Sequence, residues 1–193
     1  MSGGVFHASI ARHMRIISGS LKGRSIEVPK NFKGRPTTDF AREGLFNVLN
    51  NLVNWQDLKV LDLFAGTGAF SMECFSRGAG GILAVDIQPL HVRFINENFK
   101  NFNAHDAHAI RQDVFKFMKT VDEKFDLIFA DPPYDLPMLQ FLPETILNSA
   151  ALCDGALVVV EHGKRTDLSA SPGFFQMKTY SNVCFSFFKK VSS

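Results

Sequence analysis

From residue 57 onward, short apolar runs alternate with stretches in which apolar residues recur every three or four positions. The short runs are rich in aliphatic residues and predict strands at 59–63, 81–86, 107–111, 125–130 and 156–161. The intervening stretches predict helices near 69–77, 89–102, 114–119 and 137–149, the last interrupted at Pro143. Strands that are apolar almost throughout and alternate with helices are typical of a parallel sheet covered on both faces.

The two ends of the chain follow a different pattern. Residues 174–180 and 183–189 are aromatic-rich and flank Ser181-Asn182, so they predict an antiparallel hairpin that completes the sheet. Residues 15–18 and 25–28 predict a second hairpin near the start, because two glycines and several polar residues connect them.

We divide the chain into three parts. Residues 1–13 lack the continuous apolar core of a signal peptide and are interpreted as a loose leader or a cloning remnant. Residues 14–36 are expected to form a basic hairpin extension, and residues 37–193 the main domain. At the start of that domain, Thr37-Thr38-Asp39 offers N-caps for a helix with apolar residues from Phe40 to Leu52 at helical spacing.

Composition and charge narrow the class of protein. Of 193 residues, 46% are hydrophobic, and no apolar run approaches the ~20 residues that span a bilayer. Cys74, Cys153 and Cys184 form no Cys-x-x-Cys pair, which favours reduced thiols in the cytoplasm and no metal site. Residues 1–50 hold eight Lys/Arg against three Asp/Glu, whereas the remainder holds 13 against 16. This asymmetry predicts an anionic partner near the N-terminus, although a solvated basic tail would show the same charge.

A glycine turn follows the predicted strand 59–63. It lies in Asp62-Leu63-Phe64-Ala65-Gly66-Thr67-Gly68, and a Gly-x-Gly turn lets a cofactor approach the backbone closely. Ser71 stands where dinucleotide-binding loops have their third glycine, which counts against a nicotinamide or flavin cofactor. Asp86 ends the next predicted strand and Asp113 lies just after the third. There they could bind ribose hydroxyls and an adenine amine, although aspartates at strand ends are also common helix caps.

Together these positions predict S-adenosylmethionine, a cofactor that contains adenosine but no pyrophosphate. The cofactor contacts predicted in this region are Asp62, Phe64, Ala65, Gly66, Thr67, Gly68, Asp86, Ile87, Asp113 and Val114.

The fourth predicted strand ends at Asp131-Pro132-Pro133-Tyr134. Two prolines remove two backbone donors and favour extended conformations, so the strand end presents the Asp131 carboxylate, the Pro132 carbonyl and the Tyr134 ring together. These acceptors can bind an exocyclic amine and free its delocalised lone pair, while Tyr134 stacks on the base. The tetrapeptide therefore predicts methylation of an amino nitrogen, but adenine, guanine, cytosine and a glutamine amide all remain open. A simple strand-ending turn is the alternative interpretation.

These features together predict an α/β fold of the class I S-adenosylmethionine-dependent methyltransferase (Rossmann-like) type. We expect a mostly parallel seven-stranded sheet that ends in an antiparallel hairpin, with a small N-terminal β-hairpin extension.

The chain also resembles the bacterial RsmD-type family, which methylates the 2-amino group of one guanine in small-subunit (16S) ribosomal RNA. The resemblance covers nearly all of residues 14–190 and is most specific at Arg35-Pro36-Thr37-Thr38-Asp39, with the glycine turn and the tetrapeptide as further matches. It implies S-adenosylmethionine as methyl donor, S-adenosylhomocysteine as product, and 16S ribosomal RNA, in the small subunit or an assembly intermediate, as acceptor.

The resemblance further implies roles for residues near the N-terminus. Arg35, Thr37 and Arg42 would lie near the methionine end of the cofactor or the substrate entrance. An arginine and a helix N-terminus both favour a carboxylate, although helix capping explains Thr37 equally well. Glu73 would reach the amino end of the cofactor. The residues expected to contact RNA are Arg15, Lys22, Arg24, Lys33 and Arg42.

Two other functions are compatible with parts of this pattern. Adenine-N6 methylation of DNA uses the same tetrapeptide chemistry, but the chain has no recognisable target-recognition domain. A non-catalytic ribosome-assembly RNA-binding protein would not require Gly66, Gly68, Asp86, Asp131 and Tyr134 together. We expect a monomer without membrane association.

Overall fold

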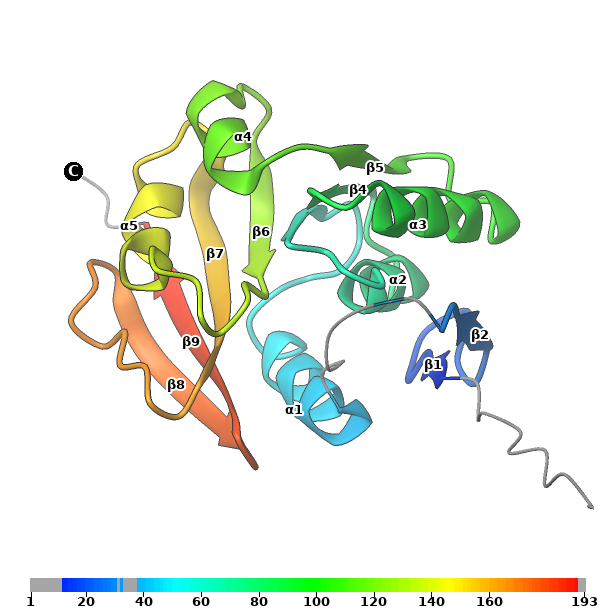
Figure 1. The fold of residues 1–193 in the computed structure, drawn as a ribbon, viewed down its shortest axis with the longest axis horizontal. Helices are drawn as coiled ribbons and strands as arrows, with labels where there is room; N and C mark the ends of the chain where they lie inside the picture. Colours follow the sequence, from blue (N-terminus) through cyan, green and yellow to red (C-terminus); the bar gives the residue numbers. More distant parts are fainter. Residues whose placement is uncertain (1–11, 31, 33–37, 191–193) are drawn as a thin grey trace, which may run out of the picture.

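The computed structural model describes residues 12–30, 32 and 38–190, and these form two sheets (Figure 1). β1 (Arg12–Arg15) and β2 (Ser25–Val28) pair antiparallel in the smaller sheet. The larger sheet has the strand order β5-β4-β3-β6-β7-β9-β8. Its parallel strands are β3 (Lys59–Leu63), β4 (Gly81–Asp86), β5 (Ala107–Arg111), β6 (Phe125–Ala130) and β7 (Leu152–Gly163). The antiparallel hairpin of β8 (Phe174–Tyr180) and β9 (Val183–Lys189) completes it.

Helices cover both faces of the larger sheet (Figure 1). One face packs against α1 (Asp39–Leu49), α2 (Ala69–Ser76) and α3 (Pro89–Asn101). The other packs against α4 (Val114–Thr120), the 3-10 turn η1 (Leu139–Phe141) and α5 (Leu142–Leu147). Val60 points into the first of these hydrophobic clusters and Leu61 into the second, so consecutive residues of β3 are both buried. Burial on both faces explains the nearly continuous apolar strands.

The small hairpin packs onto the first hydrophobic cluster. Ile26 and Val28 alternate with exposed residues along β2, and both join Met14 and Ile16 in the cluster that contains α2 and α3. The hairpin therefore buries one apolar face against the main domain, and this burial fixes its position.

The predicted α/β fold, with its mostly parallel seven-stranded sheet and N-terminal hairpin, is confirmed. Three boundaries differ. β1 starts at Arg12, within the segment interpreted as a leader. The helix expected over 137–149 is divided into η1 and α5, with Pro143 in the first turn of α5, where its missing N–H costs nothing. β7 begins at Leu152, which pairs with Phe125 before a register shift.

Among the described residues, no helix is long and apolar enough to cross a membrane.

Candidate active site

The glycine turn after β3 has a left-handed backbone, the conformation that glycine adopts most readily. Gly66 and Gly68 have φ angles of 54° and 71°, and Phe64 also lies in the left-handed region at 59°. A Cβ on Gly68 would lie 2.8 Å from Cγ1 of Ile95 on α3, so a larger residue there would force the Ile95 side chain to shift. Gly68 is also the N-cap of α2. The turn is therefore held close to α3 and leads directly into α2.

Asp86 joins the end of β4 to this turn. Its carboxylate is buried and accepts the backbone N–H groups of Gly66 and Gln88, each at 2.8 Å. His91 on α3 lies beside it, with Nδ1 3.1 Å from Oδ1. The two cofactor residues predicted from spacing, Gly66 and Asp86, are thus brought into direct contact. The predicted bond from Asp86 to a ribose remains a prediction.

The other predicted adenosine contacts lie along the same edge of the sheet. Ile87, directly after β4, is 55% exposed and offers an apolar surface to a ring. Asp113 is the N-cap of α4 and accepts the N–H of Lys116 at 2.9 Å, so its helix-capping role is established. Val114 is buried, and Phe64 packs edge-on against Phe115 with centroids 6.5 Å apart.

Asp62 lies beneath the turn rather than on the open edge. It is 1% exposed and accepts the hydroxyl of Ser71 on α2 at 2.6 Å. Burial, together with the charge of Asp86, raises the pKa of Asp62 to about 7. In this position Asp62 supports the start of α2 from below. Ala65 is also buried, and its N–H donates to the Val85 carbonyl at 3.1 Å. Thr67 is partly exposed.

The tetrapeptide lies next to the glycine turn. Ala130 and Leu63 are in register on β6 and β3, and the N–H of Asp131 donates to the Leu63 carbonyl at 3.2 Å. Pro132 is buried, whereas Tyr134 is 51% exposed. Burial, followed by the charges of Glu161 and Asp62, raises the pKa of the Asp131 carboxyl well above its usual range. The structure therefore brings together the two motifs that the sequence singled out.

Glu161 on β7 is a site residue that the sequence analysis did not identify. Its carboxylate is 2% exposed and accepts the Tyr134 hydroxyl at 3.1 Å. In the sequence it is the last residue of the predicted apolar strand 156–161. The one signal that could have identified it is a charged residue in an otherwise apolar run.

The residues expected to contact RNA divide into three groups. Arg15, Lys22 and Arg24 are exposed on the small hairpin, with Arg15 Nε 3.9 Å from Asp39 Oδ2. Lys33, and with it the predicted cofactor residues Arg35 and Thr37, lies outside the described residues. Thr38 caps α1 by accepting the N–H of Ala41 at 3.2 Å.

Arg42 forms the third group, and here the expectation is corrected. The Arg42 side chain is 6% exposed and donates to the Arg15 carbonyl and to the Asp39 carboxylate, the latter at 2.8 Å. Burial lowers the pKa of Arg42, and the charge of Asp39 opposes this effect. Arg42 therefore connects α1 to the hairpin strand β1 and presents no surface to a phosphate.

Glu73 is likewise not where it was expected. It is 1% exposed, and its carboxylate accepts the backbone N–H of Ser18 at 3.0 Å and the side chain of Arg77 at 2.8 Å. These partners lie in the hairpin connection and at the C-terminal end of α2, so Glu73 holds the hairpin instead of a cofactor.

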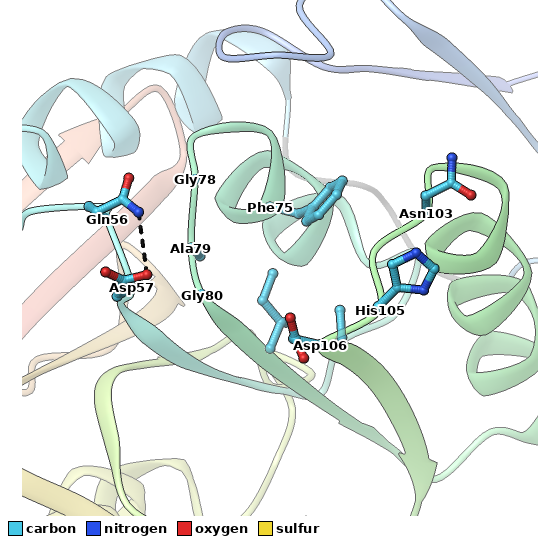
Figure 2. Close-up of a pocket in the computed structure, with 11 residues that line it drawn as sticks. Gln56, Asp57, Phe75, Gly78, Ala79, Gly80, Asn103, His105 and Asp106 are labelled. Carbon is cyan, nitrogen blue, oxygen red and sulfur yellow. Dashed lines mark hydrogen bonds between the residues drawn. The ribbon is translucent and has the colours of Figure 1, made fainter.

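A separate hollow of about 280 Å³ lies at the opposite edge of the sheet (Figure 2). Its lining includes Asp57, Gly80 and Asp106, at the N-terminal ends of β3, β4 and β5, and no predicted site residue contributes to it. Within the described parts of the chain, no group of three or more His, Cys, Asp or Glu residues could hold a metal ion.

The strand order, the glycine turn after β3 and the tetrapeptide after β6 define a methyltransferase fold of class I. The family model described as "Conserved hypothetical protein 95" matches residues 14–189. The chain is 31% identical over 159 residues to ribosomal RNA small subunit methyltransferase D of Escherichia coli strain K12, covering 82% of this chain and 79% of that relative. The chain therefore belongs to the RsmD family.

Solved structures have the same fold. The provisionally named methyltransferase yhhF from Escherichia coli matches with a TM-score of 0.81 and 27% identity, over 94% of this chain and all of that one. The 16S rRNA N2 G1207 methyltransferase RsmC of T. thermophilus, in complex with AdoMet and guanosine, matches with a TM-score of 0.69. At 21% identity, over 94% of this chain and 50% of RsmC, the likeness to RsmC concerns the fold alone.

Proposed function

We propose that this protein transfers a methyl group from S-adenosylmethionine to the exocyclic 2-amino group of a guanine in 16S ribosomal RNA. The observation that carries the proposal is the bond from Asp131 N–H to the Leu63 carbonyl, because it fixes the tetrapeptide beside the glycine turn. Membership of the RsmD family supports ribosomal RNA as the substrate. The choice of guanine rests on the sequence resemblance to the RsmD-type family.

The residues around the turn fit this cofactor. The bare backbone at Gly66 and Gly68 permits close approach, and Ile87 offers an exposed apolar face to an adenine. Asp86 and Asp113 supply carboxylates at neighbouring strand ends, where open α/β sheets bind their ligands. When bound, S-adenosylmethionine supplies an electrophilic methyl group on a sulfonium.

Asp131, Pro132 and Tyr134 then act on the acceptor. The Asp131 carboxylate and the Pro132 carbonyl accept hydrogen bonds from the amine, which frees its lone pair for attack on the methyl carbon. Tyr134 stacks on the base and holds it in line, so positioning supplies most of the rate acceleration. The nitrogen afterwards loses its proton to Asp131 or to water. Only the unprotonated carboxylate can both accept a hydrogen bond from the amine and later take up its proton. Activity should therefore fall as pH drops through the raised pKa of Asp131.

The exposed hairpin residues Arg15, Lys22 and Arg24 would hold RNA phosphates and set the position of the guanine. We place Lys33 in the same group from its sequence position. We also propose that the protein acts as a monomer in the cytoplasm, on the small subunit or an assembly intermediate.

A labelling experiment tests this function. The protein is incubated with tritiated S-adenosylmethionine and small subunits that lack the modification, and the labelled nucleoside is identified. We expect N2-methylguanosine, and no label with Asp131→Ala, which should still bind the cofactor. Parallel reactions with naked 16S RNA and with duplex DNA separate the alternatives. Label appearing in DNA as N6-methyl-2′-deoxyadenosine would overturn the proposal, as would equal labelling by Asp131→Ala.

A further inference from the structure

We infer that Glu161, at the end of β7, is a positioning residue that holds the Tyr134 ring in the orientation needed to stack on the target base. The inference rests on the proposed function, because that function assigns the stacking role to Tyr134.

Two contacts hold Tyr134 against the end of β7. Its hydroxyl donates to Oε1 of Glu161 at 3.1 Å. Its ring lies over Gly163, where a Cβ would be 3.4 Å from Cδ2 of the tyrosine. Glu161 is 2% exposed, whereas Tyr134 is 51% exposed. The hydroxyl end of the ring is thus bound to a buried group, while about half of the side chain remains open to a base.

The end of β7 is a rigid support. Glu161 and Gly163 pair with Phe185 and Val183 on β9, in the last part of an antiparallel ladder that runs from Leu157 to Gly163. Between them, His162 is buried, with Nε2 2.8 Å from the hydroxyl of Ser186. Tyr134 itself follows two prolines in a turn without ladder bonds. An exposed ring on such a turn would otherwise rotate, and misplacing a reacting group by about 1 Å can slow a reaction about a hundredfold.

Glu161 could also act through its charge. After burial, its carboxylate is the next largest influence that raises the pKa of Asp131, and it has the same rank in raising the pKa of Tyr134. The first effect would bypass Tyr134, whereas the second acts on the tyrosine itself. A test must therefore distinguish action through the Tyr134 hydroxyl from action through Asp131.

A double-mutant cycle makes this distinction. Glu161→Leu removes the acceptor at similar volume, Tyr134→Phe removes the donor but keeps the ring, and the kcat/KM of methyl transfer is measured for each and for both together. We expect each single change to lower kcat/KM about tenfold. The double variant should have a kcat/KM no lower than that of the less active single variant. A loss of about a hundredfold in the double variant, the product of the singles, would overturn the inference.

Glu161→Gln separates the acceptor from the charge. It keeps an oxygen acceptor, so we expect it to restore activity to within a few-fold of the unaltered protein. If it behaved like Glu161→Leu and its loss persisted in Tyr134→Phe, Glu161 would act through Asp131 and the inference would be wrong. Tyr180→Phe is the matched control, because its hydroxyl donates to the Gly44 carbonyl, and kcat/KM should change less than about twofold.

A second measurement does not depend on activity. The chain has two tyrosines, so Tyr180→Phe leaves Tyr134 as the only one. In that background, the phenolate absorbance of Tyr134 should appear at lower pH when Glu161→Gln removes the neighbouring charge. An unchanged titration would overturn the inference even if Glu161→Leu failed to fold. A complete lack of methyl transfer by the unaltered protein, with this shift observed, would instead count against the proposed function.

Discussion

The Glu73 carboxylate on α2 accepts the backbone N–H of Ile17, 56 residues earlier in the chain, at 2.7 Å. Ser76, one turn further along α2, binds the same connection through the N–H of Leu21 at 2.9 Å. The basic hairpin is therefore bound to the helix that begins at Gly68, and the glycine turn and the hairpin share one rigid support. This arrangement allows a bound RNA to be positioned relative to a cofactor.

Replacing Glu73 should weaken the fold as a whole. Glu73→Ala would leave the side chain of Arg77, which is 9% exposed, and two backbone N–H groups without this acceptor. We expect a loss of about 3–5 kcal/mol in the free energy of unfolding, measured by urea denaturation. Glu73→Gln keeps one acceptor oxygen and should lose less. Glu43→Ala, at an exposed position on α1, is the control and should cost less than about 0.5 kcal/mol. Equal losses at the two positions would contradict this account.

The hairpin connection offers a matched pair of glycines. Gly19 and Gly23 have φ angles of 83° and 82°, but a Cβ on Gly19 would lie 1.8 Å from the Ser76 carbonyl oxygen, whereas Gly23 faces open space. Gly23→Ala should cost only the left-handed backbone strain of about 1–2 kcal/mol. Gly19→Ala should cost clearly more and weaken RNA binding, because the hairpin must move off α2. Thermal unfolding of both variants, side by side, would reveal the difference, and identical melting temperatures would argue against the contact.

Asp62 should make stability depend on pH. Its pKa is about 7 in the folded protein and near 3.8 when exposed, so the folded state binds the proton more tightly. Its contribution is fully present below pH 3.8 and is lost as pH rises through about 7. Asp62→Asn keeps an acceptor for Ser71 without the charge, and should gain stability relative to the unaltered protein between pH 5 and 8, by at most about 4 kcal/mol. Urea denaturation at four pH values would check this. The prediction would be refuted if the free energies of unfolding of Asp62→Asn and of the unaltered protein changed with pH in parallel. The same gain in the exposed control Asp122→Asn would also refute it.

The hairpin should contribute to RNA affinity mainly through charge. Replacing Lys22 and Arg24 together by alanine should reduce the slope of log affinity against log salt by roughly 1.5, because two phosphate contacts are lost. Filter binding of the small subunit's RNA at several salt concentrations measures that slope. Lys116→Ala with Lys119→Ala, exposed on α4, is the matched control and should leave it unchanged. If both pairs had the same effect, the hairpin would be an ordinary solvated surface.

Local patterns along the chain were sufficient to predict the architecture, the glycine turn and the tetrapeptide at 131–134. Apolar runs such as 125–130 had to be buried on both faces, and the prolines after Asp131 had to end a strand, wherever the rest of the chain folded. The glycines at 66 and 68 likewise marked a turn before any contact was known. These inferences depend on neighbours within a few residues, so they were accessible from the sequence alone.

Contacts between distant residues were decided by the tertiary structure. Arg42 looked like a phosphate ligand, but the hairpin packs over it, and Glu73 turned out to bind a backbone segment 55 and 56 residues away. Glu161 accepts the Tyr134 hydroxyl because β7 pairs with β6, and this pairing brings the end of β7 beside Tyr134. A polar side chain in an apolar stretch must find a partner somewhere, but the sequence does not say which one, because that choice depends on how the elements pack.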